Sequence, residues 1–135
     1  MDWKNELTRA LKIDYPIIQA PMLGVSTPAM VAAISNEGGL GSLPVGGLPP
    51  GKTLELIQKT RTYTSKPFAV NLFANSLPAM IDVGTFDAMQ TFLANFAEEN
   101  EIDYTRSSPG GIESHSYTKQ VDVLIQENVP IVSFT

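Results

Sequence analysis

Short apolar runs alternate with longer amphipathic stretches along this chain. Four of the runs predict β-strands, and they cover Ile17–Ala20, Leu40–Leu43, Phe68–Phe73 and Ile131–Phe134. The last run is apolar on both faces, which is typical of a parallel strand that is covered on both sides. The pattern therefore predicts a parallel sheet with helices packed against it.

The stretches between the runs carry apolar residues at helical spacing. A leading helix is predicted over residues 3–12, where the apolar positions are Trp3, Leu7, Ala10 and Leu11. Later helices are predicted from Pro28 with Thr27 as N-cap, from near Lys52, from Phe86 with Thr85 as N-cap, and from Tyr117 through Val121, Leu124 and Ile125. In the helix from Phe86, one face is predicted to hold Phe86, Met89, Leu93, Phe96 and Ala97.

The order of these elements indicates an α/β fold, because strands that alternate with crossover helices run parallel. Two architectures share this order: an open doubly wound sheet and a closed (β/α)8 TIM-type barrel. An open sheet is complete with four strands, whereas a barrel needs about eight strands and typically around 250 residues. The pattern alone leaves both architectures open for a chain of 135 residues.

Composition bears on which kinds of partner the chain can bind: nucleic acid, membrane or metal. The chain is 43% hydrophobic and has a formal net charge of −5. That charge, without any cluster of Lys and Arg, argues against nucleic-acid binding. We expect no membrane partner, since no apolar stretch reaches the length of a membrane span and the start lacks a secretory pattern. The sequence has no cysteine, no metal site is expected, and the cytoplasm is the default location.

Candidate chemistry lies at the ends of the predicted strands. The first three strands end in Ala20-Pro21-Met22, Ser42-Leu43-Pro44 and Asn71-Leu72-Phe73. Ligands of parallel α/β folds bind at the carboxyl ends of strands. The Asn71 amide both donates and accepts hydrogen bonds, which suits the edge of a heterocycle. The alternative is that the prolines form turns and that the main chain satisfies Asn71. No glycine-rich phosphate loop is present, since the glycines of NEGGLGSL precede a strand.

Several of these segments occur together in one known family. DYPIIQAPMLG, NEGGLGSLPVGG and KPFAVNLFA, followed by NVPIVSFT, resemble the opening of the nitronate monooxygenases, formerly called 2-nitropropane dioxygenases. The resemblance implies an FMN-dependent (β/α)8 barrel that oxidises alkyl nitronates with molecular oxygen. Related flavin-dependent enoyl-acyl-carrier-protein reductases share PIIQ and GGLG, but APM and VNLFA favour the nitronate enzymes.

The same resemblance implies a set of FMN contacts. Ala20, Pro21 and Met22 are expected beside the isoalloxazine, and Asn71 matches an asparagine that contacts FMN. Ser42 is a further candidate, although a small residue there also serves packing. Phe73 either shapes the substrate face or belongs to the core.

The resemblance also implies that residues 1–135 are the N-terminal part of a single FMN-binding barrel domain, with only its first four strands. The family's catalytic histidine lies in the second half, so no catalytic residue is assigned here. His115 has no matching motif around it, and Asp82, Asp87 and Glu98–Glu101 are expected to be solvated helix residues. Alternatively, the chain is a catalytically incomplete half-barrel that pairs with a second copy or a complementing C-terminal half, or a reductase relative.

Overall fold

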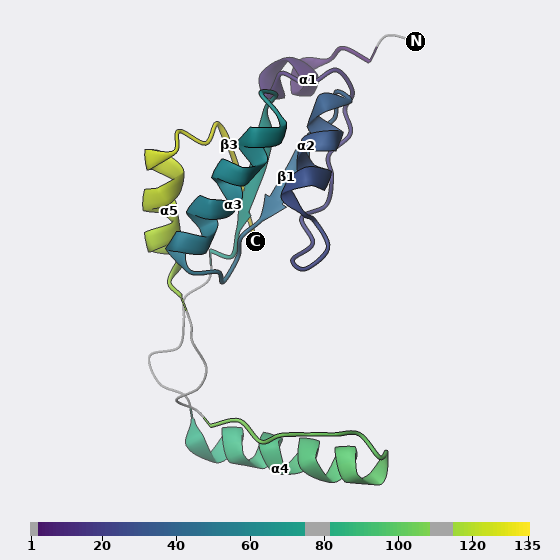
Figure 1. Ribbon diagram of the computed structural model, residues 1–135, viewed down its shortest axis with the longest axis vertical. Helices are drawn as coiled ribbons and strands as arrows, with labels where there is room; N and C mark the ends of the chain where they lie inside the picture. Colours follow the sequence, from purple (N-terminus) through teal and green to yellow (C-terminus); the bar gives the residue numbers. More distant parts are fainter. Residues whose placement is uncertain (1–2, 75–81, 109–114) are drawn as a thin grey trace. The chain divides into compact units, whose positions relative to one another are not determined.

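The computed structural model describes residues 3–74, 82–108 and 115–135 (Figure 1). By contacts the chain divides into two compact units. One unit comprises Met1–Asn75 and His115–Thr135, and the other comprises Ser76–Ser114. The larger unit contains the sheet and every candidate FMN contact named above.

The larger unit is an α/β structure. Its helices are α1 (Glu6–Leu11), α2 (Pro28–Asn36), α3 (Pro50–Tyr63) and α5 (Tyr117–Gln126), and its strands are β1 (Gly41–Pro44), β2 (Phe68–Leu72) and β3 (Ile131–Phe134). The strands are parallel and lie in the order β1-β2-β3. The predicted parallel α/β class, and the sequence order of these three strands, are therefore confirmed.

The first predicted strand, Ile17–Ala20, is wrong as a full strand. It makes one isolated parallel bridge, between Ile18 and Leu40. The Leu40 amide donates to the Ile17 carbonyl at 2.9 Å, and the Gln19 amide donates to the Leu40 carbonyl at 2.9 Å. The segment therefore lies beside β1, on the side where the first strand was expected, but its ladder stops after one step.

The ladder stops because the next donor is missing. A further parallel bridge would need the residue after Ala20 to donate its amide to Ser42, and that residue is Pro21, which has no N–H. The Ser42 amide turns instead to the side chain of Gln19, whose Oε1 accepts it at 3.2 Å. A side chain thus replaces the main chain at the carboxyl end of this segment.

Helix starts follow from their caps. The predicted N-cap Thr27 is confirmed, since its Oγ1 accepts the Met30 amide at 3.2 Å. Helix α3 begins at Pro50, slightly before the predicted start, because proline at the first helical position needs no amide partner. In α1, Asn5 and Thr8 cap each other reciprocally.

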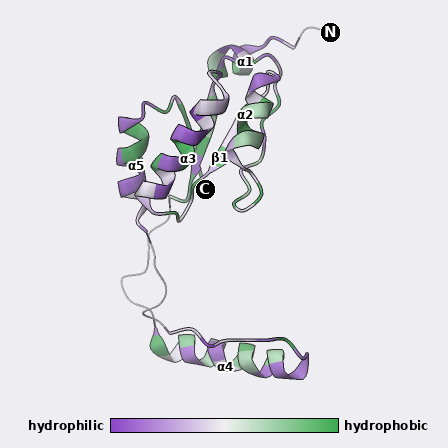
Figure 2. Cartoon of the chain, viewed as in Figure 1, coloured by the Kyte–Doolittle hydropathy of each residue, from purple (hydrophilic) through white to green (hydrophobic). Residues whose placement is uncertain are grey.

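The main core lies on one face of the sheet. Its buried residues come from the strands and from α2, α3 and α5, and they are Val31, Leu43, Val45, Ile57, Phe68, Val70, Leu72 and Leu124. Hydrophilic residues of α5 lie on its side away from this core (Figure 2). A smaller cluster of Ile13, Leu40 and Ala69 packs with Leu11 and Ile131. Since side chains alternate along a strand, Ala69 faces away from the helix-covered side that holds Phe68 and Val70.

Strand β3 is not covered on both faces as its sequence predicted. It is an edge strand, and Val132 and Phe134 are 40% and 71% exposed. With only the first four strands of a barrel, the sequence predicts that this strand lacks its next neighbour, and the described residues supply a neighbour on one side only. The exposed run therefore marks an unpaired edge of the sheet.

The smaller unit is built on α4 (Val83–Glu99). The predicted N-cap Thr85 is wrong: Asp82 caps this helix, and its carboxylate accepts the amides of Gly84 at 3.3 Å and Thr85 at 3.2 Å. Asp82 wins because a carboxylate accepts both orphan amides of the first turn and also the Thr85 hydroxyl.

The predicted single face of α4 is divided in the structure. Ala97 is buried, while Met89, Phe92 and Phe96 are exposed. The segment after the helix folds back along it, where the Tyr104 hydroxyl donates to Gln90 Oε1 at 2.6 Å. The rings of Phe92 and Phe96 stack with centroids 6.4 Å apart. The returning segment thus covers one side of α4 and leaves an aromatic side open.

The close approach of β1 to α2 yields a stability prediction. A Cβ built on Gly41 would lie 2.0 Å from the Val31 carbonyl oxygen. Because that atom is backbone, Gly41→Ala should force strand and helix apart and lower the free energy of unfolding by about 3 kcal/mol. Urea denaturation measures this loss.

Gly51→Ala is the matched control, since a Cβ on Gly51 meets nothing within 4 Å. Gly51 lies in the first turn of α3, so alanine there should be neutral or stabilising by up to about 1 kcal/mol. Equal destabilisation by the two substitutions would contradict the close packing of β1 on α2.

The Asp82 cap yields a pH prediction. Hydrogen bonds from the Thr85 hydroxyl, then from the amides of Thr85 and Gly84, lower the Asp82 pKa below its ordinary value of 3.8. The cap's stabilisation is therefore present above that ordinary value and is lost as the pH falls through the lowered pKa. NMR titration should show the Thr85 amide shifting with the Asp82 carboxyl, and Asp82→Asn should abolish the shift. An Asp82 pKa at or above 3.8 would contradict the cap.

Candidate functional site

Strand register brings the predicted strand-end residues onto one face. The paired rows across the sheet are Ser42, Ala69 and Ile131, then Pro44, Asn71 and Ser133. Paired residues of neighbouring parallel strands share a face, and this face is opposite to the one that α2, α3 and α5 cover. Pro44, Asn71 and Ser133 therefore lie together near the carboxyl ends of β1, β2 and β3, and the small side chains of Ser42 and Ala69 lie on the same face two residues earlier in their strands.

Asn71 is the best-defined member of this group. Its side chain lies at the carboxyl end of β2 and is only 6% exposed. Its Nδ2 donates to the Ser133 hydroxyl at 3.1 Å, and its main-chain carbonyl accepts the Val45 amide at 3.0 Å. Its Oδ1 accepts no hydrogen bond from the residues that the structure describes. The amide is held by a side chain, not by the main chain, and retains a free acceptor.

The Ala20-Pro21-Met22 segment is exposed and leads from the first sheet segment into a turn at residues 23–25. Ser26 closes this turn: its Oγ accepts the Met22 amide at 3.1 Å and donates to the Ala20 carbonyl at 3.3 Å. The Ser26 amide also donates to the Met22 carbonyl at 2.8 Å. The turn presents its backbone at the end of the segment that lies beside β1.

Gln19 connects this turn to β1, and sequence reasoning missed it. Its Nε2 donates to Ser26 Oγ at 2.8 Å, and its Oε1 accepts the Ser42 amide. Gln19 and Ser26 are each 8% exposed. A detectable signal existed: a glutamine inside the apolar run PIIQA must find partners if it is buried.

The other residues considered from the sequence are Ser42, Phe73, His115 and Asp87. Ser42 is buried, and its backbone amide donates to Gln19 Oε1. The Phe73 ring lies against Gly46, where an added Cβ would come within 2.6 Å of it, so Phe73 covers the loop after β1. His115 is half-buried just before the N-cap of α5. Asp87 is exposed on α4, as expected for a solvated helix surface.

Metal and membrane sites find no support in the described parts of the chain. Within residues 3–74, 82–108 and 115–135, no group of three or more His, Asp or Glu side chains could hold a metal ion. In the same residues, no helix has the length and apolar character to cross a membrane.

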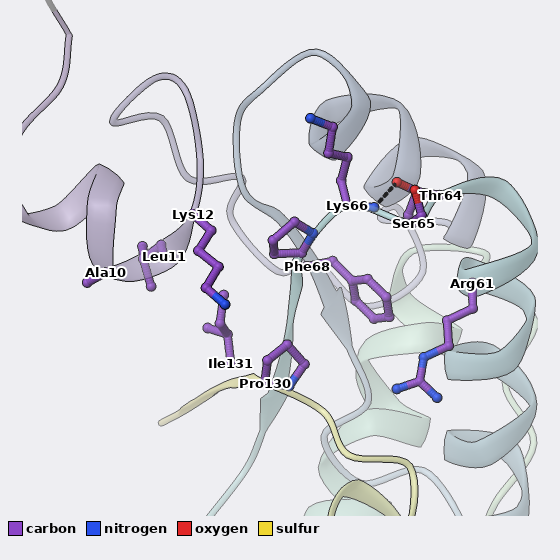
Figure 3. A pocket seen from close by; sticks show the side chains of 11 residues that line it. Ala10, Leu11, Lys12, Arg61, Thr64, Ser65, Lys66, Phe68, Pro130 and Ile131 are labelled. Atoms are coloured by element: carbon purple, nitrogen blue, oxygen red, sulfur yellow. Dashed lines mark hydrogen bonds between the residues drawn. The ribbon is translucent and has the colours of Figure 1, made fainter.

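A cavity of about 650 Å³ lies at the other end of the sheet (Figure 3). Its lining includes Phe68 and Ile131, the first residues of β2 and β3. Arg61 also lines it and pairs with Glu127, with Nη1 at 2.5 Å from Oε2. This cavity is therefore distinct from the polar face at the carboxyl ends, where Asn71 lies.

The arrangement defines the class of protein first. Parallel strands with helices between them, and polar groups at the carboxyl ends of the strands, are typical of α/β proteins that bind ligands at that edge. The family model "Nitronate monooxygenase" matches residues 4–135. The chain belongs to this family.

Individual relatives belong to the same family. The chain is 40% identical to nitronate monooxygenase of Paraburkholderia phytofirmans over 97% of its length and 36% of that protein. It is 39% identical to nitronate monooxygenase of Pseudomonas aeruginosa over 96% of its length and 37% of that protein. The chain thus spans little more than a third of the curated relatives it matches.

Solved structures match nearly the whole of this chain. The nitroalkane oxidase of Streptomyces ansochromogenes matches with a TM-score of 0.74 and 33% identity, over 96% of this chain and 35% of that one. FabK from Thermotoga maritima matches with a TM-score of 0.64 and 27% identity, over 97% of this chain and 30% of that one. The fold of this chain therefore corresponds to about a third of each.

Proposed function

We propose that this chain is the N-terminal part of an FMN-dependent enzyme that oxidises alkyl nitronates with molecular oxygen. The observation that carries the proposal is family membership across residues 4–135. The 33% identity to a solved nitroalkane oxidase supports the same class of substrate. Residues 1–135 are then one part of a single flavin-binding domain.

The sheet favours a (β/α)8 barrel over an open doubly wound sheet. An open sheet of this kind carries helices on both faces. Here α2, α3 and α5 pack on one face, while Ser42, Ala69 and Asn71 lie on the other. Ile13, together with Leu11 at the end of the short helix α1, covers only the amino-terminal part of that second face, next to Ala69 and Ile131. A face of small and polar residues suits the inside of a barrel with a ligand at its carboxyl end.

The residues present fit an FMN ring at the carboxyl end of this face. The exposed backbone of Ala20, Pro21 and Met22 would lie beside the ring, and the small side chain of Ser42 leaves room near β1. The free Oδ1 of Asn71 would accept a hydrogen bond from a ring N–H. FMN, when bound, supplies the redox chemistry of the reaction.

The contribution of this chain is binding and orientation. The candidate contacts Ala20, Pro21, Met22, Ser42 and Asn71 carry no side chain that titrates near neutral pH. A catalytic base would therefore come from the two thirds of the relatives' length that this chain does not span. A complementing C-terminal segment would be the partner that supplies such a base, whereas a second copy of this chain could pair with it but would lack the same two thirds of the length.

Asn71→Ala tests the proposed flavin contact. The test uses a protein of full family length, in which this chain is the N-terminal part. The substitution should weaken FMN binding there by about 1 kcal/mol, which is typical of one lost hydrogen bond. Flavin fluorescence during titration measures the dissociation constant. The matched control is Asn36→Ala, since Asn36 bonds the Tyr63 carbonyl and Thr64 at the amino-terminal end of β2.

Ser133→Ala separates a direct contact from support. It removes the partner of Asn71 Nδ2 but keeps the amide itself. We expect a smaller loss of FMN affinity than for Asn71→Ala. Unchanged affinity in Asn71→Ala would reassign Asn71 to a structural role.

The 135-residue chain alone should be catalytically silent. Because β3 has a strand partner on one side only among the described residues, and Phe134 is exposed, the chain should associate or lose stability. It should also retain little FMN and consume no oxygen with an alkyl nitronate. Sizing chromatography and an oxygen electrode measure these properties. A monomer that turns over nitronates would show that this chain already holds a complete active site.

The same assays distinguish the enoyl reductase alternative. The protein of full family length is supplied with either an alkyl nitronate and oxygen or an enoyl thioester and reduced nicotinamide. Oxygen consumption with the nitronate supports the proposal. Reduction of the thioester without nitronate oxidation would replace it.

A further inference from the structure

The side chains of Gln19 and Ser26 form one hydrogen-bonded unit, here called the Gln19–Ser26 brace. Gln19 Nε2 donates to Ser26 Oγ at 2.8 Å, and the Ser26 hydroxyl donates to the Ala20 carbonyl at 3.3 Å. Ser26 Oγ also accepts the Met22 amide at 3.1 Å. A serine hydroxyl has one donor and two acceptor positions, so Ser26 is fully used.

The other end of the brace is fixed to β1. Gln19 Oε1 accepts the Ser42 amide at 3.2 Å, a bond that the Gln19 main-chain carbonyl would accept if the parallel ladder continued. Pro21 ends that ladder because it cannot donate the next bond. The side chain of Gln19 thus lets the main chain leave the sheet while Ser42 keeps a partner.

Packing does little to hold the turn that the brace shapes. Met22, Leu23 and Val25 are 42%, 52% and 58% exposed. Gly24, with φ of +85°, adopts a left-handed conformation that favours glycine. Apolar burial therefore does little to fix this backbone. Its support comes from the amides of Val25 and Ser26, which donate to the Met22 carbonyl, and from the hydrogen bonds of the two nearly buried side chains of the brace.

We propose that Gln19 and Ser26 are positioning residues that hold the backbone of Ala20, Pro21 and Met22 at the carboxyl end of β1 for the flavin ring. This assignment rests on the proposed FMN site. Neither residue would touch the ring itself. They act through the turn, and their loss displaces the turn without removing any ring contact.

Amide hydrogen exchange tests the brace without any flavin. In the flavin-free protein of full family length, Gln19→Leu should lower the protection of the Ser42 and Met22 amides about tenfold, the effect of roughly one lost hydrogen bond to a buried group. The Val70 amide in the centre of β2 is the internal reference and should keep its protection. An equal loss at Val70 would mean that Gln19 stabilises the whole fold, which overturns the positioning role.

Two further variants keep the test decisive if Gln19→Leu fails to fold. Ser26→Ala removes the hydroxyl and should expose the Met22 amide, whereas Ser26→Thr retains a hydroxyl and should restore its protection. The matched control is Thr64→Val: Thr64 is also 8% exposed, and its hydroxyl donates to Asn36 Oδ1 at 2.6 Å and accepts the Lys66 amide at 3.0 Å. It precedes β2, so the Met22 amide should be unaffected.

Titration with FMN of the protein of full family length tests the link to the ring. The dissociation constant should rise about five- to tenfold for Gln19→Leu and Ser26→Ala, with a changed absorption spectrum of the bound flavin, and should return toward normal for Ser26→Thr. Thr64→Val should leave both unchanged. Selective loss of Met22 protection with normal FMN binding overturns the positioning role but leaves the proposed function standing. Absence of FMN binding by the unsubstituted protein overturns both.

Discussion

The alternation of side chains along three paired strands is the constraint on which the larger unit depends. Register aligns Val70 of β2 with Leu43 of β1, and both enter the core beneath the helices. The same register places Asn71 beside Ser133 on the opposite face. A slip of one residue would exchange these faces, burying the amide among apolar side chains and exposing the core. Apolar burial on the helix side therefore also determines which residues are available for a ligand.

The second determinant is the place where main-chain pairing ends. Proline at position 21 forbids continuation of the ladder, and this frees the backbone of the turn after Ala20. An unpaired amide at Ser42 would then be costly in a buried position, and the Gln19 side chain removes that cost. Pro21 thus ends the main-chain pairing beside β1, and Gln19, two positions earlier, keeps the Ser42 amide bonded, so the backbone after Ala20 is left exposed.

Sequence patterns predicted most of the fold because strand order follows from apolar runs separated by helices. Phe68–Leu72 and Ile131–Phe134 were found since their runs are unambiguous. The first strand was overestimated because hydrophobicity cannot show that Pro21 removes a donor from the ladder. The pattern predicts Thr85 as the cap because threonine is a good N-cap before an apolar face, and only the geometry shows that Asp82 accepts the first-turn amides.

The candidate site was predictable in part. Asn71, Ser42 and the turn after Ala20 could be named from their positions at strand ends. Gln19 could not be recognised as a connector, because its two partners, Ser26 and Ser42, lie 7 and 23 residues away in the sequence. The free Oδ1 of Asn71 also depends on a partner 62 residues away, since Ser133 engages only the Nδ2 side.

The chemistry of these residues sets what this part of the protein can contribute. Amide, hydroxyl and backbone groups orient a planar ring, but they do not take up a proton near neutral pH. A reaction that needs both orientation and a base must therefore combine this face with residues from elsewhere. In the part of the chain that the structure describes, the outer edge of β3 carries a row of backbone groups without a strand partner. Strand pairing at that edge would extend the face that carries Asn71.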